Sequence, residues 1–202
     1  MSTIQSAMRI SGGVLTKKIV AEKVPLSWKV KNLPNVWPGI CQRKISRAFG
    51  IPTYIGELGV KVLRSDGQYV DYGTVSNKAV TDGFVYNLVN WMQASPTIGL
   101  AACFHWHGSG SGAGAEGASQ TGLVSEASLA RVDGTQTESA SNAYQTVATR
   151  SYTGAFGIVE HGIFSASETT GSLLDRSLFA SIGVGTGDSI QFTYTLTISS
   201  SG

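Results

Sequence analysis

The chain is poor in charge and in the residues of metal and redox chemistry. Of its 202 residues only 14 % are charged, against about 25 % in an ordinary globular domain. It has two cysteines, Cys41 and Cys103, and three histidines. The cysteines lie far apart and neither belongs to a CxxC pair, so the chain has no zinc or thiol-exchange motif. We expect two free thiols, with a disulfide between them as the alternative.

Long apolar runs are missing as well. No stretch approaches the roughly 20 apolar residues that a membrane-spanning helix needs, so we expect no membrane partner. The N-terminal region is mixed in character and contains Arg9, Lys17 and Lys18. It has no apolar run followed by a small-residue cleavage site, and we therefore expect no signal peptide and synthesis in the cytoplasm.

Catalytic motifs are absent from the sequence. No serine stands in a GxSxG motif, and the acidic residues show no spacing typical of a catalytic carboxylate pair. The glycine-rich run Gly108–Gly117 is followed by no lysine, which excludes a phosphate-binding P-loop and indicates a flexible or packed surface loop. Asp175 and Arg176 suggest a local ion pair. We expect no enzyme, no cofactor and no small-molecule ligand.

Two of the three histidines, His105 and His107, are separated by a single residue. In a strand, His105 and His107 point to the same face, which suits metal ligands. The segment resembles a copper-site motif of multicopper oxidases, but three histidines are too few for those enzymes. It also resembles the cupin metal site, with Glu116 at the wrong spacing and His161, beside Glu160, as a third ligand. The favoured alternative is that the histidines form hydrogen bonds or lie at a subunit interface, and we expect no metal.

Residues Ser189–Ile198 show the clearest structural pattern, an alternation of apolar and polar side chains without interruption. A period of two is typical of a half-buried β-strand. One face is expected in the core and consists of Ile190, Phe192, Tyr194, Leu196 and Ile198. The other face is uncharged and is predicted to be a subunit interface, formed by Gln191, Thr193, Thr195 and Thr197.

Further strands and one helix are predicted along the chain. Short apolar runs bounded by turn residues predict strands, at Gly59–Leu63, Gln68–Val75, Leu100–His107, Tyr144–Thr153, Gly157–Phe164 and Ser172–Ile182. Residues 82–94 have the spacing of a helix capped by Thr81 or Asp82, with Phe84, Val85, Leu88, Val89 and Met92 as its buried stripe. Gly185–Asp188 is expected to form a hairpin turn. Together these patterns predict a mainly β protein, an antiparallel, jelly-roll-like β-sandwich with one α-helix.

The N-terminal residues 1–48 differ from the rest in charge. They contain nine basic residues and one acid, whereas residues 49–202 contain six basic and twelve acidic residues. Three prolines argue against a long helix, so we expect an extended basic arm (1–48) and a β-domain (49–202) that folds without it. An acidic protein surface is favoured over nucleic acid as the partner of the arm. The predicted docking residues are Trp28, Lys29, Lys31, Trp37, Arg43, Lys44 and Arg47.

Several short motifs of the C-terminal half resemble those of one protein family. They are Gly108-Ser109-Gly110 with Ala115-Glu116, Thr121–Glu126, Glu160–Ser165, Leu173–Ser177 and Gly187–Tyr194. Over residues 104–198 the chain is similar to small virion proteins of tailed bacteriophages, a family of head decoration, tail and fibre proteins. The resemblance implies a β-sandwich that is a virion component.

Combined with the composition, this resemblance leads to a functional hypothesis. We expect a capsid decoration (cement) protein that bridges neighbouring major capsid proteins on the capsid surface. It would be made in the host cytoplasm and would form a homotrimer. The alternative is a tail, baseplate or fibre adaptor. A carbohydrate-binding module or a metal-dependent, cupin-like enzyme is less favoured.

Overall fold

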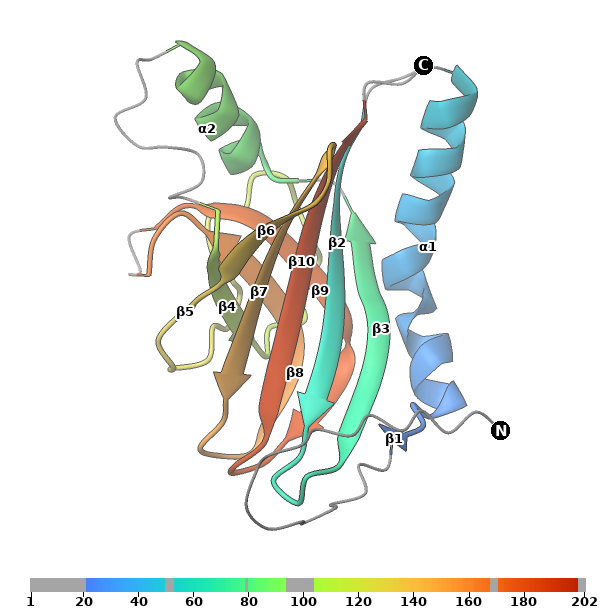
Figure 1. Ribbon diagram of the computed structural model, residues 1–202, viewed down its shortest axis with the longest axis vertical. Helices are drawn as coiled ribbons and strands as arrows, with labels where there is room; N and C mark the ends of the chain where they lie inside the picture. The colour runs from blue at the N-terminus through green and yellow to red at the C-terminus, as the bar shows by residue number, and fades with distance from the viewer. Residues whose placement is uncertain (1–20, 50–52, 79, 94–103, 168–170, 200–202) are drawn as a thin grey trace, which may run out of the picture.

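The fold was described from a computed structural model, which describes residues 21–49, 53–78, 80–93, 104–167 and 171–199. Two β-sheets pack face to face, one long helix runs beside them and a shorter helix projects from one end (Figure 1). The expected mainly β, antiparallel sandwich is confirmed.

The larger sheet, sheet A, is built around the C-terminal strand. In spatial order its six strands are β1 (Ala21–Glu22), β3 (Tyr69–Lys78), β2 (Thr53–Leu63), β10 (Ser189–Ser199), β7 (Ala143–Ser151) and β6 (Thr135–Ala140). Sheet B consists of β5 (Val132–Asp133), β4 (Trp106–Gly110), β8 (Phe156–Phe164) and β9 (Leu173–Val184). Strand β10 pairs antiparallel with β2 on one side and β7 on the other. It is therefore central in its sheet.

The alternation of β10 places its apolar side chains between the two sheets. Ile190, Phe192, Tyr194 and Leu196 are buried, as expected. Ile198 is 44 % exposed, contrary to expectation. It pairs with Tyr54 near the end of the β10–β2 ladder, where Tyr54 is exposed as well. The core thus ends one pair earlier than the sequence pattern does.

The interior contains two apolar clusters. The larger cluster is formed by residues of β2, β3, β8, β9 and β10, among them Leu58, Val60, Ile158 and Ile182. The second cluster lies toward the short helix and includes Phe84, Phe104 and Tyr194. Phe104 makes edge contacts with Phe84 and Tyr144. Strands β8 and β10 contribute to both clusters, so the clusters occupy successive positions along one sandwich.

The turn Gly185–Asp188 connects the two sheets. It is tight, because Asp188 N donates to Gly185 O at 3.1 Å. However, β9 pairs with β8 whereas β10 pairs with β2 and β7, so the expected hairpin is wrong. The Asp188 carboxylate accepts hydrogen bonds from Ser65 N, Gly185 N and the Arg64 guanidinium, which hold the crossing in place. A crossing of this kind moves the chain from one layer of a sandwich to the other.

The glycine-rich run begins inside a strand and not in a loop. Gly108 and Gly110 lie in β4, which pairs with β8. A Cβ at Gly108 would lie 2.7 Å from the ring of Phe164. A larger side chain at this position would collide with the Phe164 ring, which packs against the glycine backbone. Residues 100–103 of the predicted strand Leu100–His107, which include Cys103, lie outside the described residues.

The predicted extended arm is wrong over residues 26–48, which belong to a helix of 24 residues, α1 (Leu26–Phe49). Pro25 O accepts hydrogen bonds from Trp28 N and Lys29 N and so begins the helix. Pro34 and Pro38 lie inside it, where each removes a backbone hydrogen bond at a cost of about 3 kcal/mol. Packing against the sandwich offsets this cost, because tertiary contacts stabilise most protein helices. Residues 1–20 of the predicted arm lie outside the described part.

The short helix α2 (Asp82–Gln93) confirms the second helical prediction. Thr81 caps it, since Phe84 N donates to Thr81 Oγ1 at 3.4 Å. Phe84 is buried, but Val85 and Val89 are exposed, so the predicted stripe is only partly in the core. The side chain of Met92 lies outside the described residues. Neither α1 nor α2, the helices of the described residues, has the length and apolar character needed to cross a bilayer.

Candidate docking surface and buried polar networks

One face of helix α1 is fixed to both sheets at once. The Asn32 side chain donates to Val75 O of β3 at 2.8 Å and accepts from Ala180 N of β9 at 2.8 Å. Trp28 donates from its indole nitrogen to Ser181 O at 3.0 Å and packs edge-on against Tyr72. These contacts place α1 along the side of the sandwich where β3 and β9 lie (Figure 1).

The same face continues toward the C-terminal end of the helix. Gly39 lies against Asn77 of β3 so closely that a Cβ there would overlap the Asn77 carbonyl oxygen. Arg43 donates to Glu57 of β2 at 2.6 Å. Trp28, Asn32, Gly39 and Arg43 are separated by four, seven and four residues, which is the spacing of one helical face. The inner face of α1 is thus held along most of the helix.

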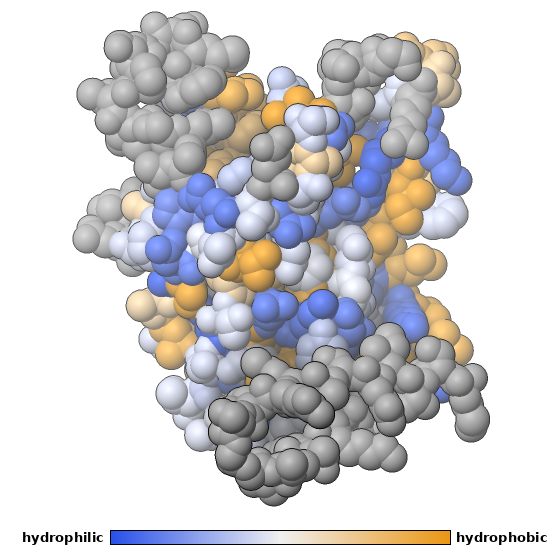
Figure 2. Space-filling view, viewed as in Figure 1, coloured by the Kyte–Doolittle hydropathy of each residue, from blue (hydrophilic) through white to orange (hydrophobic). Residues whose placement is uncertain are grey.

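The opposite face of α1 is apolar and exposed. Residues spaced by four, three and four positions form a single row along it. We call this row the outer stripe, and its members with their exposed fractions are Leu26 (75 %), Val30 (63 %), Leu33 (54 %) and Trp37 (58 %). Figure 2 shows hydrophobic side chains along the side of the molecule occupied by α1. Large apolar side chains grouped in this way are typical of an interaction surface.

Basic residues accompany the outer stripe. Helix α1 contains five basic residues, Lys29, Lys31, Arg43, Lys44 and Arg47, and no acidic residue. Lys29, Lys31 and Lys44 are exposed. By helical spacing Lys29 and Lys31 flank the stripe, and Lys44 follows Trp37 by seven residues in the same row. The surface therefore combines apolar contact area with positive charge.

The structure divides the predicted docking residues into two groups. Trp37, Lys29, Lys31 and Lys44 are exposed on α1, whereas Trp28 and Arg43 contact the chain's own strands. Arg47 lies on α1, but its side chain is outside the described residues. The prediction missed Leu26, Val30 and Leu33. Their helical spacing is visible in the sequence, but Pro34 and Pro38 argue against a helix there by propensity.

The predicted interface on β10 lies on the outer face of sheet A. Gln191, Thr193, Thr195 and Thr197 are all half-buried and uncharged. The Gln145 amide of β7 donates to Thr195 Oγ1 at 3.1 Å, so part of this row bonds within the sheet. Figure 1 shows this face of β10 and β7 turned toward the viewer. Its role as a subunit interface stays a prediction.

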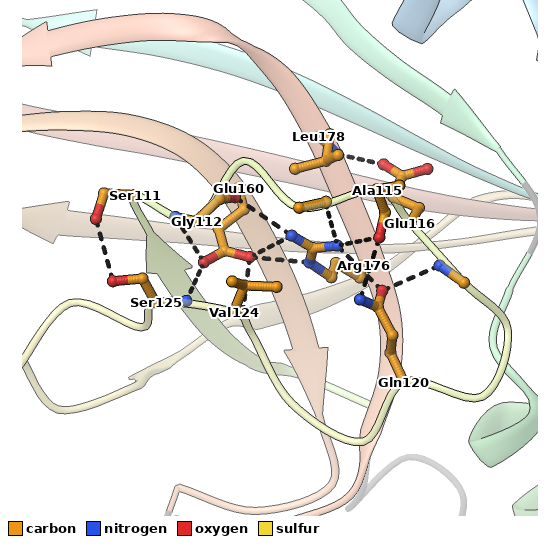
Figure 3. A network of polar contacts seen from close by, with 12 residues as sticks. Ser111, Gly112, Ala115, Glu116, Gln120, Val124, Ser125, Glu160, Arg176 and Leu178 are labelled. Atoms are coloured by element: carbon orange, nitrogen blue, oxygen red, sulfur yellow. Dashed lines mark hydrogen bonds and ion pairs between the residues drawn. The ribbon is translucent and has the colours of Figure 1, made fainter.

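The loop after β4 is fastened to sheet B by a buried ion pair (Figure 3). Glu160 of β8 and Arg176 of β9 are 0 % and 1 % exposed in their side chains, and their closest N–O distance is 2.8 Å. Glu160 also accepts hydrogen bonds from three backbone amides, those of Gly112, Val124 and Ser125. We call these two residues and the loop segments they bind (111–126) the loop clamp.

Arg176 uses its remaining donors on the same loop. It donates to the carbonyl oxygens of Gly112, Gly114 and Ala115 and to the side chain of Gln120 (Figure 3). Glu116 accepts a hydrogen bond from Leu178 N at 2.5 Å. A buried ion pair tolerates desolvation only when such additional bonds satisfy its remaining donors and acceptors. The glycine-rich loop is therefore a packed one.

Asp175 and Arg131 are two further charged residues near the clamp. Asp175 faces the interior, where it accepts a hydrogen bond from Tyr194 OH at 3.3 Å. The expected Asp175–Arg176 ion pair is wrong, because neighbouring residues of a strand point to opposite faces. Arg131 pairs with Glu126 at 2.8 Å and lies 3.3 Å from the centre of the Phe164 ring.

A second polar network lies between the two apolar clusters. His107 and His161 are buried and joined by a bond of 2.9 Å between His107 Nδ1 and His161 Nε2. His107 Nε2 contacts Thr146 Oγ1 at 3.1 Å. His161 packs on the Phe192 ring, and its Nδ1 has no hydrogen-bond partner among the described residues. We call His107 and His161 the histidine pair.

The environment of the histidine pair favours the neutral form. Burial lowers the pKa of His107 to about 3, and the neighbouring His105 and Arg150 lower this pKa further. Burial also lowers the pKa of His161 well below its ordinary value, with further lowering by His107 and Arg150. The buried Arg150 guanidinium donates to Ser109 Oγ at 3.0 Å and to the carbonyl oxygen of Ala130. Two neutral imidazoles sharing one proton between facing nitrogens form a structural hydrogen bond.

Of the four candidate metal ligands, His107 and His161 are brought together, whereas His105 and Glu116 bond to other groups. The His105 side chain contacts Gln136 and Asp133. Glu160 lies on the opposite face of β8 from His161 and belongs to the loop clamp. Within the ranges that the structure describes, no three His, Cys, Asp or Glu side chains group as metal ligands. Cys41 is a free, half-buried thiol on α1.

Comparisons with known proteins add no relative to these observations. The chain was compared with protein-family models, with curated proteins and with solved structures. None of the three comparisons finds a match.

Proposed function

We propose that the protein is a structural subunit of a bacteriophage virion, a capsid decoration (cement) protein that bridges neighbouring major capsid proteins. One observation carries the proposal. Four of the five motifs that resemble those of phage virion proteins meet in three dimensions at the loop clamp, which takes Ala115 and Glu116 from the first, Val124 and Ser125 from the second, Glu160 from the third and Arg176 from the fourth. The resemblance thus concerns residues that fix the fold.

The clamp suits a mechanical role because of what it does to the loop. Six backbone groups of the loop are bonded to Glu160 or Arg176, three amides and three carbonyls. A loop held in this way keeps its shape under load and presents no free edge to proteases. A cement protein on the outside of a pressurised shell needs both properties. Glu160 and Arg176 are used entirely in this bonding, which leaves them no catalytic role.

Helix α1 supplies the docking element of the proposed role. Its inner face is fixed to β3 and β9, and its outer stripe is directed away from the sandwich. Force applied through a docked partner would therefore be transmitted from α1 to the whole sandwich. In this proposal the partner is the major capsid protein, copies of the chain associate as a trimer, and the protein lies on the capsid surface after synthesis in the host cytoplasm.

A tail, baseplate or fibre adaptor is the second candidate, because the same family resemblance includes such proteins. The two candidates differ in copy number and position. Decoration requires many copies spread over the capsid, whereas an adaptor requires a few copies at one vertex.

The test is cryo-electron microscopy of purified particles together with quantitative mass spectrometry of their proteins. We expect the chain in a number of copies comparable with that of the major capsid protein and density for the sandwich on the capsid surface. A handful of copies at the tail vertex would favour the adaptor. Absence of the chain from purified particles would refute both candidates.

A further inference from the structure

We propose that the outer stripe of α1 seats in an apolar groove of a different protein, and that the rim of this groove carries carboxylates. The inference deepens the proposed docking role and rests on it for the partner's location in the virion. The chemistry of the groove is argued from α1 alone.

The first argument is the geometry of the stripe. Leu26, Val30, Leu33 and Trp37 repeat the i, i+4, i+7, i+11 spacing with which a helix inserts anchors into a groove. The row runs over twelve residues, and its eleven helical steps of 1.5 Å give a length of about 17 Å. Trp37 ends this row, and tryptophan is the residue most often found as an energetic centre of an interface. The stripe is narrow, which fits a groove better than a flat surface.

The second argument is rigidity. A free helix would have to order itself on binding, which costs affinity. The inner face of α1 is already ordered by Asn32 and Trp28 and by the close contact of Gly39 with Asn77. The outer stripe is therefore presented in its helical form before a partner arrives.

The third argument is charge, which decides between partners. Helix α1 has five basic residues and no acidic one. Two copies pairing through their outer stripes would bring the exposed Lys29, Lys31 and Lys44 of both helices together, six positive charges with no compensating carboxylate on either helix, and like charges across an interface are unfavourable. A groove with Asp or Glu at its rim would pair with Lys29 and Lys31 on the two sides of the stripe and with Lys44 beyond its end.

An anionic lipid surface is the competing partner of similar charge. A helix lying in a bilayer interface buries a broad apolar face and has a strongly polar opposite face. The face of α1 opposite the stripe is packed on the protein, and Lys44 interrupts the stripe's own row after Trp37. The narrow, interrupted row is typical of insertion into a protein groove.

The test is photo-crosslinking from within the stripe. A photoreactive phenylalanine derivative replaces Leu33 in the full-length chain, which is produced in infected host cells and irradiated there. The adducts are then sequenced by mass spectrometry. We expect adducts to one other protein, at an apolar segment that contains Asp or Glu. The same derivative at Tyr86, an aromatic residue that is 68 % exposed on α2, is the matched control and should not give this adduct.

Two sets of variants test the contributions separately. Trp37→Ala should reduce the adduct yield at position 33 by tenfold or more, since the loss of a hot spot weakens binding by about 30-fold. Replacing Lys29, Lys31 and Lys44 together by Glu should abolish the adduct. Gln42→Glu places one carboxylate on the same helix away from the stripe and should leave the yield nearly unchanged. Circular dichroism and thermal unfolding of each variant establish that it is folded.

Several outcomes overturn the inference. Adducts to a second copy of the chain would identify a self-association surface, and adducts to phospholipid would identify a membrane surface. Absence of any adduct, or full yield from the triple Lys→Glu variant, would equally refute the acidic groove. If the partner is a protein that is not part of the particle, the groove stands and the proposed virion role fails. Failure of the two proposals is thereby distinguished.

Discussion

Acid should destabilise this protein through the histidine pair, well above the pH at which carboxylates titrate. His107 and His161 are neutral and buried in the fold, whereas an unfolded histidine titrates near the ordinary value of 6.5. Below pH 6.5 the unfolded chain binds protons that the folded chain excludes. The free energy of unfolding therefore falls as the pH falls below 6.5, and the contribution of His107 stops changing only below its folded pKa of about 3.

The magnitude follows from the pKa difference. Each pKa unit corresponds to about 1.4 kcal/mol, so at pH 5 the exclusion of one proton costs about 2 kcal/mol relative to neutral pH. If both members of the pair stay neutral, the loss at pH 5 is about 4 kcal/mol. That is a large part of the 5–15 kcal/mol that stabilises an ordinary domain.

The assay is urea unfolding followed by tryptophan fluorescence at pH 8, 6.5, 5.5 and 5. Carboxylates interfere little in this range, because the ordinary pKa of Asp is 3.8. The double variant His107→Gln, His161→Gln should be less stable at pH 8 but should lose about 4 kcal/mol less on acidification to pH 5. Proton NMR of the histidine rings gives the two pKa values directly. A wild-type stability that is the same at pH 8 and pH 5 would refute the reasoning.

Three other predictions concern the features that hold the fold. Glu160→Gln should lower the free energy of unfolding by about 3–5 kcal/mol, because it leaves Arg176 buried without its charge partner. Limited proteolysis of this variant should cut within residues 111–126, and a loop that stays protected would contradict the clamp. Gly39→Val should destabilise the protein by about 1–3 kcal/mol or more, because the new side chain overlaps Asn77. Gly185→Ala is the control and should cost little stability, because a Cβ at this position lies 4.0 Å from Asp188. Thermal unfolding measures both variants. Burial opposes ionisation of Asp188, but its bonds to Gly185 N, Ser65 N and Arg64 outweigh this and lower its pKa. The stabilisation by the Asp188 carboxylate is therefore present above pH 3.8 and is lost below it. Asp188→Asn should cost about 1–3 kcal/mol at pH 7 and should reduce the loss of stability at the lowest pH values.

The strands could be predicted from the sequence because their burial is set by local alternation. The run Ser189–Ile198 places Ile190 and Phe192 inward whatever its neighbours are, and the structure agrees. Sheet membership could not be predicted in the same way. The turn Gly185–Asp188 has the residues of a hairpin turn, and only pairing with distant β2 and β7 shows that β10 belongs to the other sheet.

Helix α1 shows the opposite case, in which tertiary contacts override a local signal. Pro34 and Pro38 argue against a helix by propensity, yet Asn32 and Trp28 bind strands more than 40 residues away in sequence. Contacts with the strands also remove Trp28 and Arg43 from the residues available for docking. In the clamp, the sequence motifs were visible, but nothing local indicates that Glu160 and Arg176 form one pair across adjacent strands.

The position of Asn32 has a consequence for how the protein avoids unwanted polymerisation. Strands β3 and β9 lie at the border of their sheets on the side of α1, apart from the two-residue pairing of β3 with β1. Unpaired backbone groups on such borders recruit further strands and lead to aggregates. Asn32 occupies a carbonyl of β3 and an amide of β9 with one side chain. A chain from which residues 1–48 are deleted should therefore form insoluble assemblies, contrary to the expectation that the β-domain folds independently.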